Sequence, residues 1–160
     1  MHALSKLVTL GVVVAFASAV AVTVSAQTRS EIGTWKLNVA KSTYSPGPAP
    51  KSITVVFAAA GQGVKLSAEG VNGDGSKFAV TYTANYDGKD VPVTGSATVD
   101  AVSLKRINAT TVEETRKKGG KVVVTFTRVV SADGKSLTIT GKGTNPQGQA
   151  FTNVELYEKQ

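Results

Sequence analysis

The side chains that most often carry catalysis or hold metals are almost absent from this chain. Its 160 residues include a single histidine, His2, and no cysteine. Beyond residue 26 the sequence therefore offers no thiol nucleophile, no Ser-His pair, no disulfide and no imidazole or thiolate ligand for zinc or haem iron. Catalysis would have to rely on Tyr, Lys, Arg and carboxylates alone, so we predict a protein that is not an enzyme and carries no metal or cofactor.

The one pair of adjacent carboxylates, Glu113 and Glu114, cannot work as a catalytic pair. Both lie in a strand-like segment, where neighbouring side chains point to opposite faces. They therefore cannot act together on one substrate as the two carboxylates of a glycosidase do. We expect both on the surface, balancing the charges of Arg116 and Lys117.

Positive charge is spread along the chain, which has a formal net charge of +7. The one tight basic cluster, Arg116-Lys117-Lys118 with Lys121, flanks a Gly-Gly turn. Such a cluster can bind nucleic acid or an anionic surface. We interpret it instead as the solvated tip of a hairpin, and expect no nucleic-acid partner.

Runs of alternating apolar and polar residues, separated by Gly-containing turns, indicate a chain of β-strands. No segment beyond residue 26 has a 3.6-residue apolar period over ten residues, so at most one short helical turn is expected. The proline-rich stretch 45–50 cannot be a central strand, because proline lacks a ladder donor, and is expected to link the first strand to the second. The expected strands are residues 34–38, 52–59, 64–71, 77–86, 101–107, 111–116, 121–131, 136–143 and 150–158.

This number of strands, joined in sequence by short turns, favours a single antiparallel up-and-down β-barrel of eight to ten strands. A long meander must either stack into a sandwich or close, and closure removes the free edges that promote aggregation. The segment 77–86 has one apolar and aromatic face and one polar face, as a barrel wall requires. The apolar face consists of Phe78, Val80, Tyr82, Ala84 and Tyr86.

The first 26 residues have the three parts of a cleavable secretory signal. Lys6 supplies the positive start, residues 7–22 are apolar, and small residues precede a predicted cut after Ala26. The apolar run is nearly long enough to span a membrane, so an uncleaved anchor is the alternative. We predict a signal peptide over 1–26, an extension over 27–33, a barrel domain over 34–160, and a periplasmic or secreted protein without stable membrane insertion after cleavage.

The two ends of the barrel domain resemble the calycin superfamily, which includes lipocalins and intracellular fatty-acid-binding proteins. The run from Gly33 to Leu37, with Trp35 at its centre, is similar to the opening motif, and the run from Tyr157 to Lys159 to the closing one. The resemblance implies a barrel around a ligand cavity, with Trp35 plugging its closed end. With the secretory signal, the chain is most similar to exported lipocalin-like proteins of bacteria. The fatty-acid-binding branch has a helical lid where this chain has only residues 45–50.

The resemblance also implies a set of ligand-binding residues. In the fatty-acid-binding branch an Arg and an Arg-x-Tyr triplet hold a carboxylate, and the matching positions here are Arg128, Glu155 and Tyr157. A Glu in place of an Arg would repel a carboxylate, and an Arg128–Glu155 pair could neutralise itself. We therefore expect a neutral or amphipathic ligand whose polar end these residues orient. Phe57, Tyr82, Tyr86 and Phe126 would line the interior.

Two questions stay open at the level of sequence. Either face of the segment 150–158 could be internal, so Arg128 and Glu155 could instead face solvent, and the aromatic residues could be packed core rather than ligand wall. The predicted function is an exported, monomeric protein that binds a small apolar or amphipathic molecule. The alternative is a filled barrel that docks on another protein, as exported protease inhibitors do, through residues 27–33 or 45–50. A cavity of several hundred Å³ would favour the first.

Overall fold

A computed structural model describes residues 31–145 and 147–160 of the chain, which fold into one antiparallel sheet of eleven strands. The nine expected strands are all present, within a few residues of their expected bounds. Two further strands, β2 and β6, are only three and two residues long, too short for an alternation pattern to reveal them. The strands are β1 (Gly33–Leu37), β2 (Thr43–Ser45), β3 (Ser52–Ala60), β4 (Gly63–Val71), β5 (Lys77–Asn85), β6 (Val91–Pro92), β7 (Ala101–Arg106), β8 (Thr111–Lys118), β9 (Lys121–Val130), β10 (Ser136–Thr144) and β11 (Ala150–Lys159).

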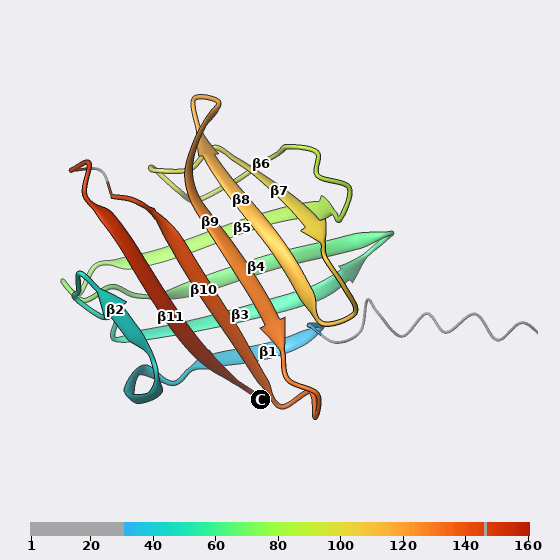
Figure 1. Ribbon diagram of the computed structural model, residues 1–160, viewed down its shortest axis with the longest axis horizontal. Coiled ribbons are helices and arrows are strands. Elements are labelled where there is room, and N and C mark those ends of the chain that lie inside the picture. The colour runs from blue at the N-terminus through green and yellow to red at the C-terminus, as the bar shows by residue number, and fades with distance from the viewer. Residues whose placement is uncertain (1–30, 146) are drawn as a thin grey trace, which may run out of the picture.

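The sheet is an up-and-down meander in which the first strand, β1, pairs with β3 on one side and with the last strand, β11, on the other. β3 to β5 and β6 to β11 each pair in sequence order, and β1 lies between β3 and β11. Trp35 stands opposite Val55 on one side and Lys159 on the other. Figure 1 shows β1 beside the C-terminal end of β11. The prediction of an all-β, antiparallel up-and-down barrel is therefore confirmed.

The barrel is nearly closed, with its weakest seam between β5 and the β6–β7 region. Thr81 and Thr94 exchange both backbone hydrogen bonds, and Asp87 pairs with Lys105 in a second isolated bridge. β5 has nine residues and only Thr81 among them forms a bridge on this side, since Asp87 follows the strand, so most of this edge has no ladder. At the seam Gly95 packs directly on the Ala79 carbonyl, where a Cβ would lie 1.9 Å from the oxygen.

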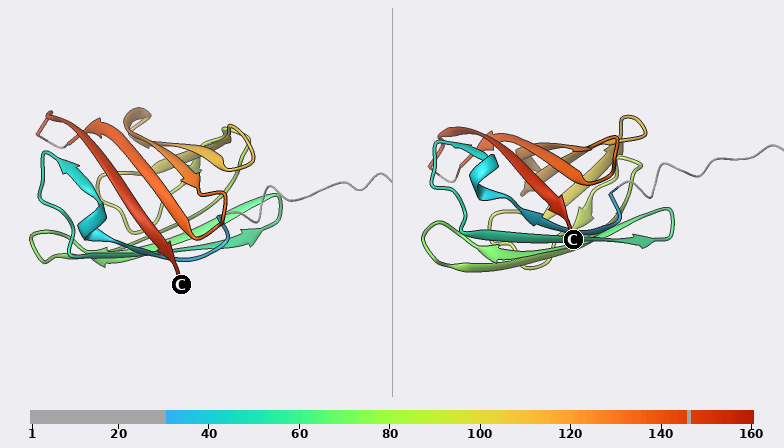
Figure 2. Two further views of the ribbon diagram at one scale, coloured as in Figure 1. Left: turned by 60° about the horizontal axis from the view of Figure 1, so that its bottom comes forward. Right: turned by 90° about the horizontal axis from the view of Figure 1, so that it is seen from below.

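Two curved walls face each other across the interior. Figure 2 shows β3, β4 and β5 on one side and β8 to β11 on the other. Alternate residues of each strand enter the core, as the period of a strand requires. Trp35 is fully buried, and its indole Nε1 donates a 2.8 Å hydrogen bond to the Glu31 carbonyl. It packs in the core with Phe57, Leu137 and Tyr157, as expected of a plug.

The two ends of the barrel differ. The end with Trp35 and the turns that follow β3, β7 and β9 is called the closed end. The other, called the open end, carries the turns that follow β4, β8 and β10 and the segment before β7. The proline-rich segment lies here, because β2 pairs with the start of β11 and Pro48 contacts Gly73 in the β4–β5 turn.

Helical structure is confined to one short turn in the part of the chain that the structure describes. It is the 3-10 helix Val39–Lys41 between β1 and β2, with Asn38 as its N-cap. The described ranges hold no helix of the length and hydropathy needed to cross a membrane. The predicted signal over 1–26 lies outside the described residues.

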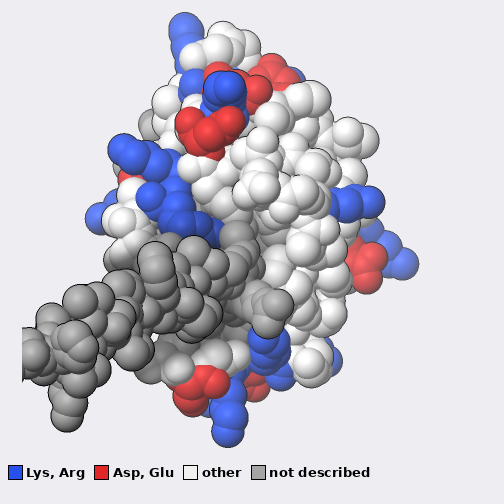
Figure 3. All heavy atoms as spheres, turned by 90° about the vertical axis from the view of Figure 1, so that its right-hand side faces the viewer, with Lys and Arg blue, Asp and Glu red and all other residues white. Residues whose placement is uncertain are grey.

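Charged side chains are dispersed over the face seen from the right of Figure 1. Figure 3 shows Lys and Arg on this face in several separate groups, with Asp and Glu among them. Four surface ion pairs bring opposite charges together in the described chain, among them Lys117–Asp90 at 2.7 Å and Lys41–Glu158 at 3.1 Å. This distribution fits the diffuse charge that the sequence indicates.

Candidate functional site

Strand alternation directs the predicted site residues into the barrel. On β11, Tyr157 is buried and Glu155 lines the interior, whereas Val154 and Glu158 are exposed. On β9, Arg128 is 2 % exposed. The interior face of β11 is therefore the one with Glu155 and Tyr157, and Arg128 does not face solvent.

Arg128 is the buried cation of the closed half of the barrel. Its guanidinium lies 3.2 Å from a Glu114 oxygen and 3.4 Å from a Glu31 oxygen, and it donates a 3.3 Å hydrogen bond to the Tyr82 hydroxyl. The guanidinium also lies over the Phe57 ring, 4.8 Å from its centre. The Arg128–Glu155 pair that the sequence allows does not form, because two other carboxylates, Glu31 and Glu114, hold Arg128.

Glu114 is a core residue, so its expected place on the surface is wrong. It is 1 % exposed and accepts a 2.7 Å hydrogen bond from the Tyr82 hydroxyl and another from Arg116. Burial alone would raise the pKa of Glu114, but Arg116, Arg128 and the Tyr82 hydroxyl outweigh it and hold that pKa below its usual 4.5. Glu114 is therefore an anion that its neighbours keep charged.

Glu31 brings the segment before β1 into the same cluster. It is buried, and the Tyr86 hydroxyl donates a short hydrogen bond to its carboxylate. We call Glu31, Tyr82, Tyr86, Glu114 and Arg128 the closed-end network. Because this network and the ring of Phe57 fill the closed half, the three predicted aromatics Phe57, Tyr82 and Tyr86 pack as core. They line none of the cavities described below.

Above the network lies a small interior cavity of about 130 Å³. The other four predicted site residues, Phe126, Arg128, Glu155 and Tyr157, line it, and Phe126 and Arg128 share one strand face as expected. This volume is below the 300 Å³ or so at which small-molecule sites begin. The barrel is therefore filled at its closed end and only partly hollow above. The rest of the lining is Ile53, Val55, Leu66, Ala68, Phe78, Glu114, Arg116 and Ile139.

Glu155 gives the interior cavity a carboxyl group that gains protons easily. The Tyr157 hydroxyl donates a 2.7 Å hydrogen bond to it. Burial raises the pKa of Glu155, and the hydrogen bond from Tyr157 and the charge of Arg116 offset that rise only in part. The same burial, next to this carboxylate, raises the pKa of Tyr157 and keeps it a neutral donor. This wall can therefore both donate and accept hydrogen bonds.

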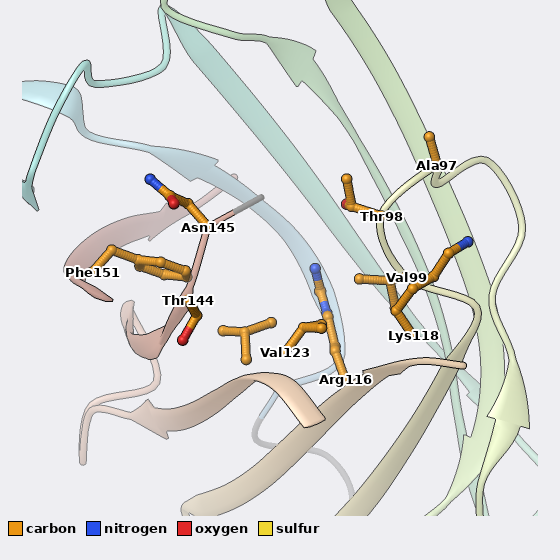
Figure 4. Close-up of a pocket in the computed structure, with 10 residues that line it drawn as sticks. Ala97, Thr98, Val99, Arg116, Lys118, Val123, Thr144, Asn145 and Phe151 are labelled. Atoms are coloured by element: carbon orange, nitrogen blue, oxygen red, sulfur yellow. The ribbon is translucent and has the colours of Figure 1, made fainter. Parts of the chain in front are cut away.

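A larger pocket of about 430 Å³, called the mouth pocket, lies at the open end beside the interior cavity. Figure 4 shows Thr144, Asn145 and Phe151 on one side and Val99 and Lys118 on the other, with Arg116 reaching between them. Arg116 lines both the mouth pocket and the interior cavity. Its side chain is 26 % exposed and that of Lys117 is 25 % exposed, so only Lys118 and Lys121 of the basic cluster form the expected solvated tip. The lining also includes Ala97, Thr98, Val123 and Val124.

A third depression, of about 510 Å³, lies under the proline-rich segment on the other side of the open end. Pro48 and Pro50 form its outer wall, and Ile53, Phe78 and Glu155 belong both to it and to the interior cavity. The interior cavity is thus bordered at the open end by two pockets. The proline-rich segment is part of this mouth as well as a linker.

The residues that sequence reasoning missed are Glu31, Glu114 and Arg116. The sequence held a signal for two of them. Val112, Glu114 and Arg116 lie on one face of β8, and the apolar Val112 predicts that this face points inward. Glu31 precedes the first strand and has no pattern of its own. The described part of the chain contains no group of three or more His, Cys, Asp or Glu placed to hold a metal ion.

No protein-family model and no curated protein matches this sequence. Among solved structures, a redesigned β-barrel is similar with a TM-score of 0.50 and 14 % identity, covering 84 % of this chain and 95 % of that one. Zebrafish ileal bile acid-binding protein, in complex with cholic acid, has a TM-score of 0.49 and 12 % identity, covering 82 % of this chain and 99 % of its own. At such low identity a likeness shows the fold alone. This chain is an all-β protein that shares the barrel fold of the redesigned protein.

Proposed function

We propose that this protein binds a small apolar or amphipathic molecule at the open end of its barrel. The observation that carries the proposal is the mouth pocket of about 430 Å³ beside an interior cavity, with Arg116 lining both. A volume of this size is within the range of small-molecule sites, and a mostly apolar lining with a few polar groups is typical of them. The apolar part comes from valines of two segments and from Phe151.

The ligand is placed by apolar contact and oriented by polar side chains. Val99, Val124 and Phe151 supply the contact surface of the mouth pocket. Arg116 is the charged residue that lines both spaces, and Glu155 and Tyr157 of β11 also line the interior cavity. Arg128, which the sequence places among the ligand-binding residues, supports this arrangement from the closed-end network.

The proposal also covers the location of the protein, its oligomeric state and its lack of enzymatic activity. We propose that residues 1–26 direct export and are removed, that the barrel acts in the periplasm or outside the cell as a monomer, and that it is not an enzyme. Support for export comes from the three-part pattern of the first 26 residues. The relation to calycins is supported by the barrel topology and by the burial of Trp35 and Tyr157 at the closed end.

The second candidate is an interaction module, and the filled closed half of the barrel favours it. An inhibitor-like barrel needs no cavity, and the interior cavity alone is too small for most ligands. The exposed part of the proline-rich segment would then be the contact element. Uptake of a small molecule at the mouth separates the two functions.

The test is a titration with an environment-sensitive hydrophobic dye, comparing two tryptophan variants. Thr98→Trp places a large ring in the mouth pocket, whereas Thr127→Trp places the same ring on the outer face of β9. We expect saturable 1:1 dye binding to the parent and to Thr127→Trp, and at least about tenfold weaker binding to Thr98→Trp. Absence of saturable binding to the parent, or equal binding to both variants, would contradict the proposal.

A further inference from the structure

The mouth pocket carries two cations and no carboxylate in its lining. Arg116 and Lys118 are its charged members, and its other side chains are apolar, hydroxyl or amide groups. We propose that this pocket binds a compact aromatic anion, whose carboxylate pairs with the guanidinium of Arg116 and whose ring packs on Phe151 and Val99. This inference rests on the proposed function and names the class of its ligand.

Arg116 has hydrogen-bond donors that a second carboxylate can use. Its side chain has five N–H donors in a planar fork. Within the described residues it uses one of them, Nε, in a side-chain hydrogen bond to Glu114. Its guanidinium carbon lies 4.6 Å from the centre of the Phe126 ring, which fixes the plane of the fork. A planar fork fixed in this way favours a carboxylate that can accept two parallel hydrogen bonds.

The charge at the mouth excludes the opposite class of ligand. Lys118 lies at the rim, 4.0 Å from Asp100, and its side chain is half exposed. Glu114, the carboxylate that holds Arg116, is buried behind it and is shared with Arg128, which Glu31 also pairs, so the charges that line the pocket itself are the two cations Arg116 and Lys118. A cationic ligand would meet like charge in a partly desolvated pocket, which costs affinity.

The shape of the site favours a ring over a long chain. The interior cavity offers only about 130 Å³ beyond Arg116, so a long alkyl tail has no room to extend into the barrel. The mouth pocket is wider, and Figure 4 shows the ring of Phe151 directed into it across from Val99. A flat aromatic ring can stack on Phe151 and contact Val99 together.

The first test uses four probes on the purified protein: 2-naphthoate, 2-naphthylmethanol, 2-naphthylmethylammonium and palmitate. Calorimetric titration is expected to give a dissociation constant for naphthoate at least about tenfold below that of the alcohol, with the ammonium weaker than both. An alcohol or ammonium that binds as tightly as naphthoate would overturn the anion assignment and leave the proposed function intact. Palmitate binding more tightly than naphthoate would overturn the assignment to a compact ring. Failure of all four probes would contradict the proposed function itself.

The second test removes the two charges singly. Arg116→Gln is expected to abolish the preference for naphthoate over the alcohol, and Lys118→Gln to weaken naphthoate about threefold. Lys135→Gln, which removes the same charge from a turn at the closed end, is the control and should change nothing. If Arg116→Gln unfolds because Glu114 has lost one of its partners, Lys118→Gln is the variant that tests the proposal. Naphthoate affinity equal in Lys118→Gln and Lys135→Gln, and insensitive to salt, would refute the proposal.

Discussion

Arg128 and Glu114 lie where charged side chains are rarely found, and each is there because of the other. An unpaired charge in a barrel core would cost many kcal/mol, so it must be paired and hydrogen-bonded. Arg128 has Glu114 and Glu31 within 3.4 Å, and Tyr82 hydrogen-bonds both Arg128 and Glu114. The pair therefore has a structural task at the closed end, whatever it contributes to a ligand above.

Arg128→Ala is expected to destabilise the barrel strongly. It leaves Glu31 and Glu114 buried without their shared cation, which costs about 3–5 kcal/mol of unfolding free energy. Urea denaturation followed by the fluorescence of Trp35, the only tryptophan, measures it. Lys121→Ala on the same strand is exposed and should change stability by less than about 0.5 kcal/mol. A loss below about 1 kcal/mol for Arg128→Ala would contradict the structural role of this side chain.

Glu155 gives the stability of the protein a pH dependence of a definite sign. Burial raises its pKa above the ordinary 4.5, so the folded chain holds this proton more tightly than the unfolded chain. As the pH rises from 4.5 through the folded pKa, the unfolded state loses the proton first, and the free energy of unfolding falls. Glu155→Gln removes this titration and keeps an oxygen that can accept the Tyr157 hydrogen bond.

The expected result is a stability difference that changes only in that window. Relative to the parent, Glu155→Gln should gain stability as the pH rises above 4.5 and keep a constant advantage above the folded pKa. Glu114 has a lowered pKa and acts in the opposite sense, but it is common to both proteins and cancels in the difference. Urea denaturation at several pH values measures the difference, and a gap that stays flat or closes with rising pH would contradict the assignment.

At the scale of the elements, the seam between β5 and β6 is the weakest part of the wall. Gly95→Ala is expected to open it, because the new Cβ would collide with the Ala79 carbonyl and the residue would keep a positive φ of 87°. Gly88 also has a positive φ, 77°, but a Cβ added there meets no atom within 4 Å. The difference between Gly95→Ala and Gly88→Ala therefore measures the cost of the collision. We expect Gly95→Ala to cost about 1–3 kcal/mol more and to speed amide hydrogen exchange at Thr81 and Thr94. Equal stability of the two variants would place the weak seam elsewhere.

The strands could be predicted from sequence because polar and apolar residues alternate along each of them, which gives the strand one polar and one apolar face. The same alternation predicts β11 equally well with either face inward, so the direction of Glu155 and Tyr157 came only from the structure. Glu114 was misplaced because a carboxylate in a strand usually faces water. Its burial depends on Arg128 and Tyr82, which lie 14 and 32 residues away in sequence and become neighbours only in the closed barrel.

At the scale of the whole molecule, the barrel divides its interior into two parts. The closed half is filled by Trp35, Phe57 and the closed-end network, and rigid packing there holds the strands in place. The open half keeps the interior cavity and the mouth pocket, bordered by the proline-rich segment. Fold alone does not give a function, since many functions share one barrel. The volume and lining of the open half support a small molecule over a protein partner.

Native mass spectrometry of the protein, recovered from the compartment in which it naturally resides, tests that claim most directly. We expect a fraction of the protein to carry one small molecule, which can be released by unfolding and identified, and which added dye displaces. A protein that is empty in this measurement, and that also takes up no hydrophobic dye in the titration above, would contradict the binding function and favour the filled interaction module.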